Sequence, residues 1–156
     1  MTHLITQPSA SGQLAALAQQ SPLGQTINDS QLITQMNNCP DWESRYRIIM
    51  QLGKQLPPLP TELRTPESEI HGCESDVWLV VAQYKEHYYI LADSRARIVK
   101  GLIAAVICAL QGKSTEAILS FDLPDYFRQL SLEKHLTPSR SNGLASIIET
   151  IKNSVQ

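Results

Sequence analysis

The central segment of the sequence is VWLVVAQYKEHYYILA, residues 77–92, in which two apolar runs flank the charged pair Lys85-Glu86. Valine, tryptophan, tyrosine and isoleucine favour strands, so the runs predict strands over residues 77–84 and 87–92, with Lys85-Glu86 as the hairpin turn. Successive side chains of a strand point to opposite faces, and in the first run both faces are apolar. We therefore expect other elements to cover both faces of this strand.

A helix is predicted upstream of the hairpin, over residues 40–53, where Asp41 lies at the start and glycine at the end. Trp42, Tyr46, Ile49 and Met50 recur within it at helical spacing, so they form one apolar stripe. Trp42 and Tyr46 are therefore expected in the core rather than on a ligand-binding surface.

Downstream, residues 95–110 are apolar nearly all round a helical projection, which is typical of a buried central helix, and Asp93-Ser94 is expected to cap it. Shorter helices are predicted over residues 115–120 and 125–130. The last helix is expected to begin at Thr137-Pro138, with threonine as the cap and proline in the first turn. Its buried stripe would comprise Leu144, Ile147, Ile148, Ile151 and Val155.

Residues 1–28 are rich in glutamine, serine, alanine and threonine, which predicts a loosely ordered arm with a short helix at residues 14–18. The folded domain is expected over residues 29–156, beginning with a helix capped by Asp29 or Ser30. Helices, then a hairpin, then more helices predict the α+β class, with a small antiparallel sheet packed against helices.

The 156 residues suit a single domain, and a net charge of −2 gives no reason to expect nucleic acid or an anionic membrane as a partner. The three cysteines lie far apart and form no Cys-x-x-Cys or Cys/His cluster, so neither a disulfide framework nor a zinc site is indicated. The longest apolar run, residues 102–110, is too short to span a bilayer, and the start lacks the pattern of a signal peptide. We expect a soluble protein of the reducing cytoplasm. No glycine-rich nucleotide-binding motif occurs.

One cysteine has a context that favours chemistry. Cys73 follows Gly72 in a polar, acidic segment immediately before the first predicted strand, so a loop would present its thiol. The alternative is a half-buried cysteine that only packs, as free cysteines commonly do. Glu69, Glu74 and Asp76 give the segment a negative field, which is expected to raise the pKa of the thiol and keep it unreactive until a partner arrives.

A histidine near Cys73 raises the question of a Cys/His hydrolase. His71 lies two residues before Cys73 and would share its face if the segment is extended. The partners of catalytic dyads normally converge from distant segments, so an exposed loop histidine is the alternative interpretation.

The segment Gly72-Cys73-Glu74-Ser75-Asp76-Val77-Trp78 resembles the Gly-Cys-x-Ser-x-Val-Trp signature of the SufE-like sulfur acceptors, the family that includes CsdE. Three further motifs are similar to those of the family and occur in the family's order, so the resemblance runs from about residue 30 to 152. They are Trp42-Glu43-x-x-Tyr46 with Leu52-Gly53-x-x-Leu56-Pro57, Asp93-Ser94 with Ile98-Val99-Lys100-Gly101-Leu102, and His135-Leu136-Thr137-Pro138-Ser139-Arg140-Ser141-x-Gly143-Leu144.

The resemblance implies an accessory sulfur-transfer protein rather than an enzyme, with a fold like that of the IscU-type cluster scaffolds. Such proteins stimulate a cysteine desulfurase that depends on pyridoxal phosphate, of the SufS or CsdA type. They accept its persulfide sulfur on the signature cysteine, here Cys73, and relay it to an iron–sulfur scaffold or another acceptor. The acceptor needs no cofactor or metal, because the desulfurase carries the pyridoxal phosphate.

Partner contacts are expected from four residues. Arg140 lies near the start of the last predicted helix, whereas a cation is more favourable near a helix C-terminus. We therefore expect Arg140 to contact the desulfurase or to support the Cys73 segment, with a solvated helix residue as the alternative. His71, Glu74 and Asp76 are expected to belong to the same partner surface.

Two other functions stay open on the sequence alone. An IscU-like iron–sulfur scaffold would need several cysteines converging on iron, whereas only Cys73 has a loop context. A thiol redox sensor would need a resolving cysteine, for which Cys39 is the candidate.

Overall fold

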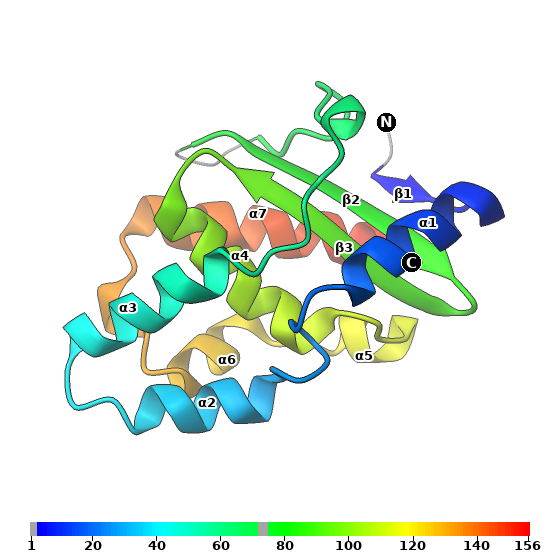
Figure 1. Ribbon diagram of the computed structural model, residues 1–156. Helices are drawn as coiled ribbons and strands as arrows, with labels where there is room; N and C mark the ends of the chain where they lie inside the picture. The colour runs from blue at the N-terminus through cyan, green and yellow to red at the C-terminus, as the bar shows by residue number, and fades with distance from the viewer. Residues whose placement is uncertain (1–2, 72–74) are drawn as a thin grey trace.

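A long hairpin forms the centre of the fold in the computed structural model, which describes residues 3–71 and 75–156 (Figure 1). Strands β2 (Val77–Tyr84) and β3 (His87–Ser94) are antiparallel, from Val77 opposite Ser94 to Tyr84 opposite His87. Lys85 and Glu86 have φ angles of 51° and 67°, the left-handed conformations that a tight two-residue turn requires. The predicted hairpin is confirmed, and β3 extends two residues beyond its predicted end.

The remaining elements of the described chain are one short strand, seven α-helices and two 3₁₀ turns, so the predicted α+β class is confirmed. They are β1 (Leu4–Ile5), α1 (Pro8–Gln19), α2 (Asp29–Asn37), α3 (Trp42–Gly53), η1 (Thr61–Leu63), α4 (Arg97–Leu110), α5 (Thr115–Leu119), α6 (Leu123–Gln129), η2 (Glu133–His135) and α7 (Pro138–Val155).

The sheet has the order β1-β2-β3 and is mixed rather than purely antiparallel as expected. β1 runs parallel to β2, with Leu4 opposite Val81. Two apolar residues carry too little alternation to mark a strand in the sequence, so the strand shows only in its pairing with β2.

The outer edge of β3 is covered by the chain that leaves α4. The Gln111 side chain accepts from the Ile90 N–H at 2.5 Å and donates to the Ile90 carbonyl at 3.0 Å, as a neighbouring strand would. Beyond it, the Gly112 N–H donates to the Tyr88 carbonyl at 2.8 Å, and the Tyr88 N–H donates to the Lys113 carbonyl at 3.0 Å. Gln111 is buried, so both of its polar groups need these bonds.

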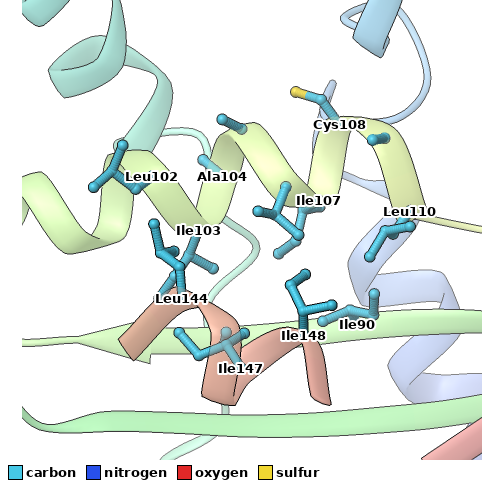
Figure 2. Packing of buried hydrophobic residues seen from close by; sticks show 14 of the residues in the cluster. Ile90, Leu102, Ile103, Ala104, Ile107, Cys108, Leu110, Leu144, Ile147 and Ile148 are labelled. Atoms are coloured by element: carbon cyan, nitrogen blue, oxygen red, sulfur yellow. The ribbon is translucent and has the colours of Figure 1, made fainter. Parts of the chain in front are cut away.

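One face of the hairpin packs on α4 and α7. Figure 2 shows Ile103 and Ile107 of α4 directed toward Ile147 and Ile148 of α7, with Ile90 of β3 beside them. Nearly every residue of α4 is buried, which confirms it as the central helix. The predicted stripe of α7 is buried as expected.

The opposite face of the hairpin is covered by α1, so both faces are covered as predicted (Figure 1). The structure differs from the expected loosely ordered arm with a helix at residues 14–18. Pro8 starts the helix earlier, because proline suits the first helical position, and Ser11 Oγ bonds the Ile5 carbonyl at 2.8 Å. The division between an arm and a domain at residue 28 stays a prediction. The cluster on this face comprises Leu14, Ala18, Leu59, Trp78, Val80, Ala82 and Leu91.

Helix α3 is correctly predicted, but its buried face is only partly so: Ile49 is buried as expected, whereas Tyr46 is not. Tyr46 is 41% exposed and Trp42 only half-buried, whereas Ile49, Leu52 and Gly53 are buried. The prediction that Trp42 and Tyr46 belong to the core is therefore wrong for Tyr46. The face of α3 that is buried is the one that contacts α4. The close approach of the two helices leaves room there for small or branched residues but not for aromatic ones.

Helices α3 and α4 cross at two glycines. A Cβ atom at Gly53 would lie 2.8 Å from the backbone nitrogen of Gly101. A Cβ atom at Gly101 would lie 2.9 Å from the carbonyl carbon of Ile49 and still closer to its oxygen. Because real Cβ atoms do not approach backbone this closely, only glycines allow the two helices to cross at this separation.

The helix starts show which predicted caps form. Thr137 Oγ1 accepts from the Arg140 N–H at 3.2 Å, which confirms Thr137 as the cap of α7. α2 is capped by Asn28 rather than by Asp29 or Ser30. α4 begins at Arg97 without a side-chain cap, so the expected cap at Asp93-Ser94 is wrong, because β3 continues through those residues.

Candidate functional site

The segment that carries Cys73 is closed at its base by backbone pairing. The Ile70 N–H donates to the Val77 carbonyl at 2.8 Å, and the Leu79 N–H donates to the Ser68 carbonyl at 2.8 Å. Residues 68–70 thus run antiparallel to the start of β2, and residues 71–76 connect the two paired ends. Cys73 and Glu74, both predicted site residues, lie outside the described residues.

Ser68 fixes the chain before this loop. Its buried hydroxyl donates to the Leu63 carbonyl at 2.5 Å and accepts from the Thr65 N–H at 3.2 Å. Residues 63–70 are therefore folded on themselves before they pair with β2. The chain that leads into the Cys73 segment is thus held by hydrogen bonds between residues close together in the sequence.

The outgoing side of the loop is attached to the end of β3. The hydroxyls of Ser75 and Ser94 lie 3.2 Å apart, within hydrogen-bond distance. Asp76, predicted as a partner contact, pairs with Arg95 at 3.1 Å. Ser75 and Asp76 are thus each bound to a residue at the end of β3 or directly after it, Ser94 and Arg95 respectively.

Two guanidinium groups stack on Trp78, the second residue of β2. The guanidinium carbons of Arg64 and Arg95 lie 5.5 and 5.6 Å from the centre of the indole ring, within the range of cation–π attraction. Arg64 also pairs with Asp93, and Lys100 of α4 lies 3.6 Å from the same carboxylate. The site therefore includes a charged network around a buried aromatic ring.

Sequence reasoning missed Arg64, Asp93, Arg95 and Lys100 as members of the site. They come from three separated segments, and no local spacing relates one to another. The one local signal in the sequence is Trp78, which lies just after an acidic segment. Both its aromatic ring and the neighbouring carboxylates attract cations.

The other described partner residues, His71 and Arg140, lie on separate segments of the chain. His71 is exposed, which agrees with the interpretation as a loop histidine. Arg140 lies in the first turn of α7 and is half-buried; Val99 and Leu102 of α4 line a small cavity beside it. Arg140 therefore lies against the first turns of α4, the helix that follows Arg95.

The remaining cysteines, Cys39 and Cys108, have different environments. Cys108 is 1% exposed, and burial raises the pKa of its thiol to about 12, so it stays protonated at neutral pH. In Figure 2 its sulfur lies on the side of α4 away from α7. Cys39 is half-buried after the end of α2, where its thiol lies 3.5 Å from the Gln35 carbonyl as a weak donor.

A groove of about 810 Å³ lies elsewhere, between α6 and α7. None of its lining residues belongs to the charged network or to residues 68–71 and 75–78. Within the described part of the chain, no three histidine, cysteine or acidic side chains gather closely enough to hold a metal ion. In the same residues, no helix has both the length and the apolar character needed to cross a membrane.

The family model described as "SufE: Fe-S metabolism associated domain" matches residues 30–155. The chain belongs to the SufE family. This match spans α2 to α7, the loop and the charged network, so the family resemblance seen in the sequence motifs is confirmed. The α1 helix and β1 precede the matched region of this SufE-family protein.

A solved structure has the same fold. The solution structure of a hypothetical protein from Thermus thermophilus is similar with a TM-score of 0.69, over 86% of this chain and 94% of that chain. The two sequences are 21% identical, so the likeness concerns the fold alone.

Proposed function

We propose that this SufE-family protein accepts sulfur from a pyridoxal-phosphate-dependent cysteine desulfurase as a persulfide on Cys73. It stimulates that desulfurase and relays the sulfur to iron–sulfur cluster assembly in the cytoplasm. The observation that carries the proposal is the match to an Fe–S metabolism domain over residues 30–155, within which Cys73 lies between two paired chain ends.

The transfer is an exchange at sulfur. The Cys73 thiolate attacks the outer sulfur of the persulfide on the desulfurase, a new sulfur–sulfur bond forms, the old one breaks, and the desulfurase cysteine leaves as a thiolate. Electrons balance without an added oxidant or reductant. The chain itself supplies only the attacking thiol and its positioning, and the chemistry of sulfur release from cysteine belongs to the desulfurase.

The other thiols favour a carrier over a cluster scaffold. Cluster binding requires several thiolates, but the Cys108 thiol is held protonated by burial. Persulfide transfer requires a single accessible thiol, and a glycine-preceded cysteine in a polar, acidic segment of the sequence suits that requirement.

The direct test is an assay of sulfide release from cysteine by a cysteine desulfurase of the SufS or CsdA type, with a reductant present and this protein titrated in. We expect the rate to rise and then saturate, and mass spectrometry to find one added sulfur atom on Cys73. A flat titration with both desulfurases, together with no added sulfur, would contradict the proposal.

Arg140 is proposed to contribute to the desulfurase contact. Arg140→Ala is expected to raise about fivefold the concentration of this protein needed for half-maximal stimulation, because the loss of a contact worth about 1 kcal/mol weakens binding by about that factor. The melting temperature should change little, since the side chain is only half-buried. Lys134→Ala, which removes an exposed cation just before α7, is the matched control. An unchanged titration for Arg140→Ala would remove this residue from the interface.

A further inference from the structure

The groove between α6 and α7 is an open apolar surface with charged residues around it. Leu119 lines it and is 39% exposed; among the described residues, Tyr46 is the other large apolar side chain that is so exposed. An exposed apolar surface with a polar rim is typical of a site where another molecule binds. The remaining large apolar side chains of the groove are buried or half-buried: Phe121, Leu123, Phe127, Leu136, Leu144 and Ile148.

The shape of the groove suits a helix. The α7 residues that line it recur three or four positions apart from Ser141 to Asn153, so one side of α7 faces the groove over about 18 Å. The other side is formed by residues 119–124 and by α6. Ser141 and Ala145 are exposed within it, and their short side chains allow a second helix to approach α7 closely. The groove is therefore long enough for about three turns of a helix.

Both cations that line the groove are already engaged. Arg128 pairs with Asp125, one turn earlier on α6. The Lys152 ammonium group donates to the Phe121 carbonyl at 2.6 Å and so joins α7 to the segment before α6. An anionic ligand would have to compete with these contacts.

Two of the carboxylates that line the groove are free to bind a partner. Glu133 in η2 and Glu149 in α7 are exposed, and neither forms a hydrogen bond or an ion pair with another residue that the structure describes. The third, Asp122, accepts from the Asp125 N–H at 3.0 Å as the cap of α6. The charge that remains available is negative, so a cationic partner is complementary to it.

We propose that this groove is a docking site for a basic amphipathic helix of a partner protein. The apolar side of that helix packs on Leu119 and on the apolar lining, and its lysines or arginines face Glu133 and Glu149. A helix in a hydrophobic groove is a recurring mode of peptide recognition, in which the anchors recur three or four residues apart. No groove residue belongs to the charged network around Trp78, and the proposal does not depend on sulfur acceptance.

The test uses two synthetic helical peptides of about 16 residues, in which leucines recur three or four positions apart. One peptide has lysine at its polar positions and the other has glutamate. The change in fluorescence anisotropy of each labelled peptide, titrated with this protein, gives its Kd. We expect the lysine peptide to bind at least about tenfold more tightly, and its binding to weaken at high salt. Its binding should slow amide exchange in residues 119–128 and 141–153.

Matched variants place the binding in the groove. Glu149→Gln is expected to weaken binding of the lysine peptide about threefold, the scale of an exposed ion pair. Glu43→Gln, which removes an exposed carboxylate of α3, should leave binding unchanged. Leu119→Ser should weaken binding about fivefold, because an apolar contact is lost. Tyr46→Ser alters a side chain of similar exposure on α3 and should have no effect.

Equal affinity for the two peptides would overturn the proposal, and so would an equal loss of affinity in the groove variants and their controls. Sedimentation of the free protein tests the other occupant. A dimer that Leu119→Ser dissociates and Tyr46→Ser does not would assign the groove to a second copy of this chain and would also overturn the proposal. Because no desulfurase is present in these measurements, their failure would leave sulfur acceptance intact, and a failure of sulfur acceptance would leave these results standing.

Discussion

Cys73→Ser is expected to abolish both sulfur acceptance and stimulation of the desulfurase, so that sulfide release falls to the rate of the desulfurase alone. A serine hydroxyl is not ionised at neutral pH and does not take sulfur from a persulfide, so no smaller effect is expected. The change replaces one sulfur atom by oxygen, and the residues on either side of the segment, Ile70 and Val77, stay paired through their backbones. Folding should therefore persist, as a melting curve would show.

The matched variants are Cys39→Ser and Cys108→Ala. Cys39 is only half-buried, and its replacement should leave both the added sulfur and the stimulation unchanged. Cys108→Ala removes a thiol that is protonated and buried, so it should lower stability without changing sulfur transfer. Added sulfur on the Cys73→Ser protein, together with its loss from Cys39→Ser, would assign the carrier role to Cys39.

Gly101→Ala is expected to destabilise the protein by about 2 kcal/mol, because overpacking costs about 1–3 kcal/mol and the gain in helix propensity offsets part of it. The added methyl group would meet the backbone of Ile49, which cannot turn aside as a side chain can. For a chain of 156 residues this corresponds to a fall in melting temperature of about 4–8 °C.

Gly12→Ala is the control for this prediction, because it also replaces a helical glycine. A Cβ atom there would lie 3.3 Å from the Tyr84 ring, a side chain that can shift. We expect this variant to be as stable as the wild type or up to about 1 kcal/mol more stable. Equal melting temperatures for the Gly101→Ala and wild-type proteins would show that α3 and α4 can separate at little cost.

The hairpin, the central helix and the last helix could be predicted because their signals are local. Apolar residues fill both faces of residues 77–84, and an apolar circumference marks α4. Tyr46 shows the limit of periodicity: it has the spacing of a core residue, yet the contact with α4 turns it outward. The length of helix α1 could not be predicted, because many of its residues are small or polar and show no clear apolar stripe. The helix is stabilised by packing on a face of the sheet, which the sequence alone does not show.

In the candidate site, too, features with a local sequence signal could be predicted and features formed by distant residues could not. Cys73 could be proposed as its centre from the sequence because glycine, cysteine and the following strand are adjacent in the chain, and this role stays a prediction. The network around Trp78 could not, because Arg64 and Arg95 lie far apart in the sequence and converge only when the hairpin forms. The exposed pair Asp76–Arg95 illustrates this: the sequence marks Asp76 as acidic but does not show which cation it meets.

The covered edge of β3 limits how another protein can bind here. Many partners dock by adding a strand to an open sheet, with backbone hydrogen bonds supplying the affinity. At Ile90 the amide of Gln111 already occupies those bonds, and at Tyr88 the chain at Gly112 and Lys113 does so. An incoming strand would first have to displace a buried glutamine. Along these residues a partner protein must therefore recognise side chains rather than backbone, and two copies of the chain cannot join edge to edge there into an extended sheet.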